Sequence, residues 1–223
     1  MNRLLPGLIA VILLTVSAGV YIWNNLDGLL QAVIQNHASK VLTTEIHVAE
    51  IRTDRQRGRG NIAGISIANP QGFSETNIIQ LGKITFRVNT ESSGIDPIIL
   101  NEVVIRGADA VYEINDAGVS NVDTLKRQIH ARRYQKSENS SPLKFIIRKL
   151  VVETSMARVR TPATGNGSKR IRLPKIMMHN VGNTDAGITA GEIMRQLTFR
   201  MLGNMSNAVA ATGEQVPAIS SAE

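Results

Sequence analysis

The chain has no cysteine in its 223 residues, so neither disulfide bonds nor cysteine-ligated zinc can hold its fold together. Aromatic residues make up only 4 % of the chain, which leaves little material for the stacking platforms that bind single-stranded nucleic acid. The four histidines are His37, His47, His130 and His179, and they lack the spacing of a ligand set. We therefore expect no metal site, no cofactor and no nucleic-acid partner.

The motifs of common catalytic sites are also missing. The chain has no Gly-x-Ser-x-Gly turn, no His-Glu-x-x-His pair and no Walker loop. Carboxylates such as Asp109, Glu113 and Asp123 are most simply strand-edge and capping residues. A triad built from distant residues is the one catalytic arrangement that the sequence leaves open. We expect a protein that is not an enzyme.

Positive charge is in excess. The formal net charge is +7 and the isoelectric point is near 10.0, which favours anionic partners such as phospholipid headgroups, lipopolysaccharide or nucleic acid. Nucleic acid ranks last of the three because aromatic residues are few and the chain carries an export signal, described next.

Residues 4–23 form an uncharged run that is long enough, as a helix, to cross a bilayer. Tyr21 and Trp23 close the run with the rings that favour the lipid–water boundary. Arg3 precedes the run, and the next basic residue is Lys40. The positive-inside rule then places the N-terminus in the cytoplasm and the rest of the chain outside.

A cleaved secretory signal is the alternative, with Val16-Ser17-Ala18 as an acceptable cleavage site. The apolar run continues past Ala18 to Trp23, which favours an uncleaved anchor. A large exported domain without cysteine suits a bacterial periplasm. We expect a single-pass protein of the bacterial inner membrane whose main domain is periplasmic.

Residues 26–42 have the period of an amphipathic helix that continues from the anchor. Its apolar positions recur at steps of three and four: Leu26, Leu29, Leu30, Val33, Ile34, Ala38 and Val41. This stripe is either a core face packed on a sheet or one wall of an apolar groove shared with lipid.

Strand patterns begin at Ile46. Residues 46–51 and 61–68 flank the segment TDRQRGRG, whose glycines permit a hairpin turn. The arginines make this turn a basic tip, which either contacts a phosphate-bearing headgroup or is simply a solvated hairpin end. The candidate headgroup contacts are Arg52, Arg55, Arg57 and Arg59.

A further strand is predicted over residues 80–89, with Gly82 as a bulge. Alternation places Ile84, Phe86 and Val88 on its inward face. The intervening residues Lys83, Thr85 and Arg87 then point outward.

Residues 100–112 and 147–159 repeat one pattern: a mostly apolar strand, a tight polar turn and a second strand. We interpret both as hairpins of a meandering antiparallel sheet. The first copy is followed by a helix that starts at Ser120, with Val122, Leu125 and Ile129 as its apolar stripe.

The last predicted element is a helix that begins at a capping box, Thr189-Ala190-Gly191-Glu192. Its apolar stripe consists of Ile193, Leu197, Met201, Met205 and Val209. The methionines either fill the core adaptably or contact lipid. Residues 213–223 are expected to be a flexible tail.

Short motifs resemble the AsmA-like family of bacterial envelope proteins. They are the run GISIANPQGF at residues 64–73, the Tyr112-Glu113 pair, and SNVDTL at residues 120–125. The resemblance covers about residues 1–200. It implies an inner-membrane protein with a curved antiparallel sheet whose interior can hold acyl chains. Larger members are implicated in moving phospholipid toward the outer membrane, whereas this chain has no long array of repeated strands.

The expected fold is α+β: an anchor (residues 1–25) that continues into an amphipathic helix, a curved and mainly antiparallel sheet with one short helix, and a C-terminal amphipathic helix. Residues 26–212 form the periplasmic domain. The chain is then a non-catalytic accessory of lipid handling or outer-membrane biogenesis, or else an anchored scaffold that binds other envelope proteins and no lipid. For the first, the candidate lipid-facing residues are Val33, Ile34, Phe86, Met201 and Met205.

Overall fold

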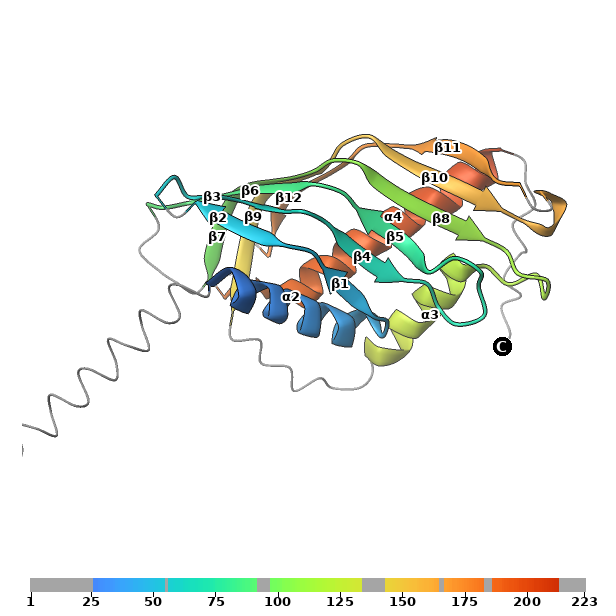
Figure 1. The fold of residues 1–223 in the computed structure, drawn as a ribbon, viewed down its shortest axis with the longest axis horizontal. Coiled ribbons are helices and arrows are strands. Elements are labelled where there is room, and N and C mark those ends of the chain that lie inside the picture. Colours follow the sequence, from blue (N-terminus) through green and yellow to red (C-terminus); the bar gives the residue numbers. More distant parts are fainter. Residues whose placement is uncertain are drawn as a thin grey trace, which may run out of the picture.

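The computed structural model describes residues 26–54, 56–91, 97–133, 143–164, 167–182 and 186–212. They form an α+β fold in which a sheet curves over three helices (Figure 1). The helices are α2 (Leu26–Leu42), α3 (Asn121–Arg133) and α4 (Ala190–Ala211), and a 3₁₀ turn spans Pro162–Thr164. The strands are β1 (Ile46–Val48), β2 (Ile51–Asp54), β3 (Arg59–Ile62), β4 (Ile65–Ala68), β5 (Asn77–Leu81), β6 (Ile84–Val88), β7 (Ile98–Ile105), β8 (Ala108–Glu113), β9 (Lys144–Val152), β10 (Ser155–Arg160), β11 (Lys169–Leu173), β12 (Ile176–Val181) and β13 (Ile188–Thr189).

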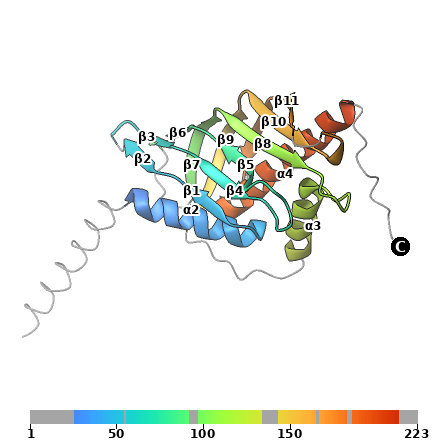
Figure 2. The same cartoon turned by 45° about the vertical axis from the view of Figure 1, so that its right-hand side comes forward.

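The strands form two sheets that are continuous with each other. Sheet A has the order β1-β4-β5-β8-β10-β11, and sheet B has the order β2-β3-β6-β7-β9-β12, with β13 beside β9. Each strand of sheet A therefore continues into the corresponding strand of sheet B after a short bend. Backbone hydrogen bonds cross the bend, as from Gly82 N to Gly107 O (3.1 Å) and from Arg106 N to Lys83 O (2.9 Å). The bend lets six long chain passes wrap around the helices (Figure 2).

Gly82 lies in this bend and is not a bulge within one strand, so the expected strand 80–89 is divided between β5 and β6. A Cβ on Gly82 would lie 2.4 Å from the backbone oxygen of Arg106 and 2.7 Å from that of Gly107. The inward and outward alternation over residues 83–88 is as predicted, because Ile84 is buried and Arg87 is exposed.

We expect Gly82→Ala to lower the free energy of unfolding by about 2 kcal/mol, because two backbone carbonyls block the added methyl group. The matched change Gly203→Ala, within α4, meets no atom within 4 Å and should stabilise by about 0.5–1 kcal/mol. Urea denaturation of both variants measures the difference. Equal and small effects would show that the bend accommodates a side chain.

The repeated segments at residues 100–112 and 147–159 are not hairpins. Each is one bent strand, β7–β8 and β9–β10, and the two strands pair in parallel. Leu100 faces Ile147 and Ala108 faces Ser155, so the sequence repeat matches the strand register at both ends. Helix α3 lies between the two passes in the chain, as a crossover between parallel strands requires. The other neighbouring strands are antiparallel.

All three helices agree with the sequence predictions. Helix α2 has the predicted bounds, α3 buries Val122, Leu125 and Ile129, and the side chain of Thr189 caps α4 by accepting a hydrogen bond from Glu192 N (3.2 Å). Figure 1 shows α4 running beneath the sheet with α2 and α3 on the same side. Their buried side chains and those of the sheet form one core.

Polar side chains at every fourth position of α2 bind the outer edge of strands β1 and β2. The bonds are Ile46 N to Ser39 Oγ (3.0 Å), Val48 N to Gln35 Oε1 (3.1 Å), Gln31 Nε2 to Val48 O (2.7 Å) and Thr53 Oγ1 to Asp27 Oδ1 (2.6 Å). The first three, together with a longer bond from Thr53 N to Asp27 Oδ2 (3.4 Å), satisfy backbone groups that an edge strand would otherwise expose. This stripe fixes α2 along β1 of sheet A and β2 of sheet B.

No helix within the described ranges is long and apolar enough to cross a membrane. The expected anchor, residues 1–25, and the expected tail, residues 213–223, lie outside those ranges.

Candidate functional site

An apolar cavity of about 700 Å³ lies between the concave face of sheet B and the first halves of α2 and α4. Its volume is within the range of roughly 300–1,000 Å³ that is typical of small-molecule sites. Its apolar lining includes Leu30 and Ile34 from α2, Ile193, Met194 and Leu197 from α4, and Ile62, Phe86, Leu100, Val103, Phe145, Ile147 and Leu150 from sheet B.

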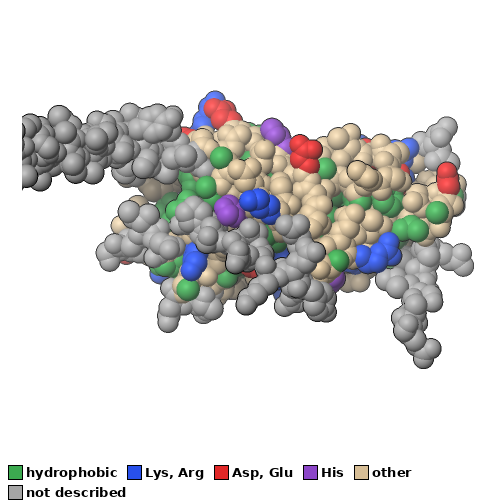
Figure 3. All heavy atoms as spheres, turned by 90° about the horizontal axis from the view of Figure 1, so that it is seen from below, with side chains coloured by type: hydrophobic (Ala, Val, Ile, Leu, Met, Phe, Trp, Pro, Cys, Tyr) green, Lys and Arg blue, Asp and Glu red, His purple; other side chains and the backbone are tan. Residues whose placement is uncertain are grey.

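The cavity is not sealed from solvent. Leu30, Ile34, Leu100 and Ile193 line it and are only half-buried, although all four are large apolar side chains packed against the core. Figure 3 shows hydrophobic side chains at the surface toward the left-hand end of the view, with basic side chains among them. Half-exposed apolar side chains that converge on one cavity mark a surface that can bind an apolar ligand.

Phe86 helps to keep the space open. Its ring lies against the backbone of Gly60 on the neighbouring strand, where a Cβ would be 2.3 Å from the ring Cζ. The glycine thus allows the ring to lie close along the sheet. A side chain at position 60 would push the ring toward the helices and reduce the cavity.

The cavity lies at the end of the domain where the described chain begins. Helix α2 starts at Leu26, and its first half supplies Leu30 and Ile34, whereas Ala38 and Leu42 in its second half are fully buried core residues. The turn between β2 and β3 is at the same end, and Arg59 of that hairpin also lines the cavity. Residues 1–25, whose sequence predicts an anchor, join the domain directly at this end.

The five candidate lipid-facing residues divide into two groups. Ile34 and Phe86 line the cavity. Val33 is half-buried but does not line it, and Met201 and Met205 are 1 % and 0 % exposed, within the closed core. The reason is the course of α4: only its first half faces sheet B, and its second half is packed between sheet A and α3.

Ile193 and Met194 on α4, and Leu100, Phe145 and Ile147 on sheet B, line the cavity and were not among the candidates. Ile193 belongs to the apolar stripe predicted for the last helix. The strand residues lie in the repeated apolar segments or directly beside them, where alternation is too weak to separate the two faces.

The candidate headgroup contacts differ in their partners. Arg52 pairs with Glu50 (2.8 Å) and Arg57 pairs with Asp54 (2.9 Å). The hydrogen bond to Glu50 raises the pKa of Arg52, and the hydrogen bonds from Arg57 lower the pKa of Asp54. Arg59 is exposed and has no carboxylate partner within the described part of the chain. Arg55 lies outside the described residues.

The motifs that carry the family resemblance meet at the other end of the molecule. The buried side chain of Asn121 donates to Asn69 Oδ1 (3.0 Å) and Val111 O (2.9 Å) and accepts from Glu113 N (3.0 Å). The Glu113 carboxylate accepts from Ser74 N (2.7 Å). These residues therefore join the turn after β4 to β8 and the start of α3, and they do not line the cavity.

Tyr112, beside this network, is 1 % exposed, and burial raises the pKa of its hydroxyl. The charge of Asp123 adds to the rise, while the Ser120 hydroxyl opposes it. The unfolded chain then loses this proton first as the pH rises, so stability is complete below the ordinary tyrosine pKa of about 10 and is lost above it.

We expect Tyr112→Phe to remove this alkaline loss of stability. Between pH 8 and 9 the variant and the parent chain should respond alike to pH, and above pH ~10 only the parent chain should lose additional stability. Denaturant unfolding as a function of pH measures the two slopes. Parallel curves up to pH 11 would show that Tyr112 ionises as easily in the folded state as in the unfolded state.

Within the described ranges, no cluster of three or more His, Cys, Asp or Glu side chains could hold a metal ion. A scan against protein-family models and a search of curated proteins each found no match to this chain.

Proposed function

We propose that this chain is a non-catalytic, membrane-anchored protein that holds the acyl chains of a lipid in the apolar cavity. The observation that carries the proposal is the cavity itself: about 700 Å³, lined almost entirely by apolar side chains and bordered by half-exposed ones. A domain that needed only to be a rigid scaffold would gain stability by filling such a space, because empty apolar cavities cost packing energy.

The position of the cavity supports a membrane source for the ligand. An anchor in residues 1–25 would join α2 at the end of the domain where the cavity lies. A lipid leaving the outer leaflet would then meet apolar side chains without crossing the length of the domain. In this proposal the chain belongs to the bacterial inner membrane with a periplasmic domain, and it acts as an AsmA-like accessory in lipid handling or outer-membrane biogenesis.

Mass spectrometry of the full-length chain, purified in mild detergent, tests the proposal. Phospholipid should remain bound at about one molecule per chain. Ile193→Glu should remove it, because a carboxylate in the cavity repels acyl chains but still reaches water. The control Arg170→Gln, an exposed change on β11, should leave the lipid in place. A chain free of lipid, or lipid that stays bound to Ile193→Glu, would contradict acyl-chain binding.

An anchored scaffold without lipid is the second candidate, and the outer edge of β11 and β12 favours it. These strands end both sheets, and no described residue pairs with their outer backbone groups except Asn204, whose side chain reaches Pro174 O (3.4 Å). Met177 on this edge is 49 % exposed. Such an edge accepts an added strand from a partner. Crosslinks from Met177 to a protein, combined with an empty cavity, would favour the scaffold.

A further inference from the structure

The outer face of sheet B carries a second, chemically different hollow, which we call the basic concavity. It has a volume of about 570 Å³ and is open to solvent. Five cationic side chains surround it, and two neutral polar side chains, Asn61 and Thr85, lie between them. The cations are Arg52, Arg59, Lys83, Arg87 and Arg106.

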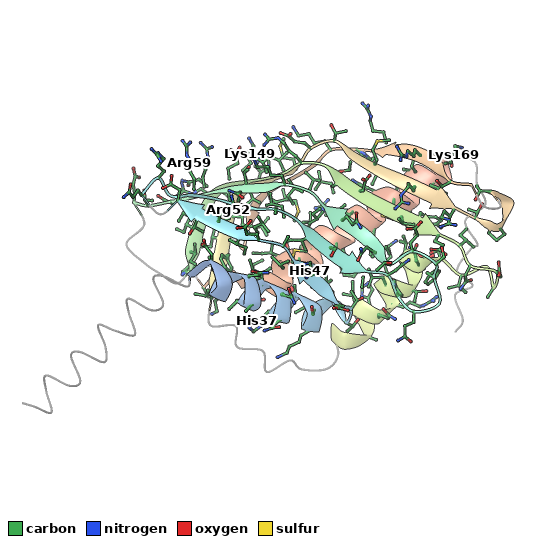
Figure 4. All side chains as sticks on the ribbon, viewed as in Figure 1. His37, His47, Arg52, Arg59, Lys149 and Lys169 are labelled. Atoms are coloured by element: carbon green, nitrogen blue, oxygen red, sulfur yellow. The ribbon has the colours of Figure 1, made fainter. Side chains whose placement is uncertain are left out.

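The strand register explains how these side chains converge. Arg59 on β3 is directly opposite Arg87 on β6, and Asn61 is directly opposite Thr85. Residues two apart on a strand share a face, so Lys83 follows Thr85 on the same side, just before β6 begins. Cations therefore flank a neutral polar floor on both sides. Figure 4 shows Arg59 on the upper side of the sheet, away from α2.

The facing pair Arg59 and Arg87 costs stability, because like charges directly opposite each other on neighbouring strands repel. Glu102 neutralises the charge of only one member of the pair, because it forms ion pairs with Arg87 (2.8 Å) and with Lys149 (3.1 Å). Arg59 and Lys83 have no carboxylate partner within the described part of the chain. A bound anion would supply the missing negative charge.

The other cations remain available to a ligand. Arg52 pairs with Glu50 and Arg106 pairs with Glu153, both at 2.8 Å, but the arginine side chains are 71 % and 54 % exposed. Exposed ion pairs of this kind contribute little, so their arginines can turn to a stronger anion. Only two carboxylates, Asp54 and Glu102, line the basic concavity, and Asp54 is held by Arg57.

We propose that the basic concavity binds a compact ligand with at least two phosphate groups. Guanidinium groups match phosphate oxygens with two parallel hydrogen bonds, and four of the five cations are arginines. Lys83 and Arg87 are four residues apart on an extended chain, so their Cα atoms are separated by roughly 13 Å. This distance is large enough for each of the two side chains to bind a different phosphate group. Asn61 and Thr85 face the part of the ligand between them. Of the five cations, only Arg59 also lines the apolar cavity, so phosphate binding here does not require acyl-chain binding there.

Calorimetric titration of the full-length chain in a non-ionic detergent with inorganic tripolyphosphate tests the proposal. We expect saturable binding that weakens as salt is raised. The double variant Arg59→Gln, Lys83→Gln should bind at least tenfold more weakly. Glu102→Gln should bind severalfold more tightly, because it removes a competing carboxylate. All three positions lie on the solvent-facing side of the sheet, so both variants should stay folded; the melting temperature should rise slightly without Arg59, which repels Arg87, and fall slightly without Glu102, which pairs with Arg87 and Lys149.

The matched control is Arg170→Gln, Arg172→Gln, which removes the same charge from exposed positions on β11 in sheet A. Its affinity for tripolyphosphate should stay within twofold of the parent chain. An equal loss in both double variants would show non-specific attraction to net charge and would overturn the proposal. The absence of saturable binding to the parent chain would overturn it as well.

A second arm separates a free ligand from a lipid headgroup. Cardiolipin, which has two phosphates, is added to the detergent micelles, with phosphatidylcholine as the control. For a lipid-borne ligand, cardiolipin should displace tripolyphosphate from the parent chain and phosphatidylcholine should not. For a free ligand, neither lipid should displace it. Both results are consistent with a phosphate site, and they show whether its ligand is a lipid headgroup or a free phosphate compound.

Discussion

Replacing Met205 with glutamate should unfold the domain, whereas the same replacement at Ile193 should leave it folded. Both residues belong to the apolar stripe of α4, but Met205 is 0 % exposed in the closed core and Ile193 is half-buried at the cavity. An unpaired carboxylate in the core costs at least about 4 kcal/mol, which is most of the stability of an ordinary domain. At the cavity, the glutamate reaches water and the cost should stay near 1 kcal/mol.

Circular dichroism and urea denaturation of the two purified variants measure this difference. The pair is well matched, because the helix, the introduced residue and the charge are the same. Unfolding of both variants would mean that the cavity is closed and filled in solution. Folding of both would mean that the second half of α4 does not pack as described.

Asn121→Ala should lower the free energy of unfolding by about 3 kcal/mol. The change removes the hydrogen bonds that Asn121 makes with two buried backbone groups, Glu113 N and Val111 O, and with the half-buried Asn69 Oδ1. Each unsatisfied buried polar group costs roughly 1–3 kcal/mol, and partial access of water keeps the sum below the maximum. The loss should appear in the midpoint of urea denaturation.

Asn207→Ala is the matched control, because Asn207 is an exposed residue on α4. Alanine has the higher helix propensity, so this variant should be as stable as the parent chain or slightly more stable. If Asn121→Ala is as stable as Asn207→Ala, the hydrogen bonds of Asn121 do not stabilise the contact between α3 and the turn that follows β4. The variant should still bind lipid, since Asn121 is not part of the cavity lining.

The helices were predictable because their signals are local. The capping box at Thr189 and the apolar steps of α2 and α3 depend only on neighbouring residues, and the structure confirms them. The polar stripe of α2 was equally visible in the sequence at positions 27, 31, 35 and 39. Its role was not, because its partners are groups of the edge strands β1 and β2 that only the fold brings close.

The strands were predictable in alternation but not in pairing. A tight polar pair such as Arg106-Gly107 has the same composition whether the chain reverses or merely bends. Here it bends, because Gly107 O accepts from Gly82 N and the chain continues into the next sheet. Residues 100–112 and 147–159 have similar sequences, and the residues that match in sequence are also the ones that pair in the parallel strands. A repeated pattern alone, however, does not distinguish parallel neighbours from successive hairpins.

The cavity was predictable only in part. The apolar stripe of α4 is continuous, so periodicity could not show that its first half faces a cavity and its second half a filled core. Ile34 and Phe86 line the cavity, and Met201 and Met205 do not. The difference arises because the first half of α4 faces sheet B and its second half is packed between sheet A and α3, which no single segment of the sequence reveals.

Photo-crosslinking in living cells tests acyl-chain binding most directly. A photoreactive residue at Ile34 or Ile193, on two helices that line the cavity, should capture phospholipid. The same residue at Arg170, an exposed position on β11 that lines neither hollow, should not. If Ile34 and Ile193 yield only protein crosslinks, or if Arg170 captures phospholipid as efficiently as they do, the cavity does not hold acyl chains.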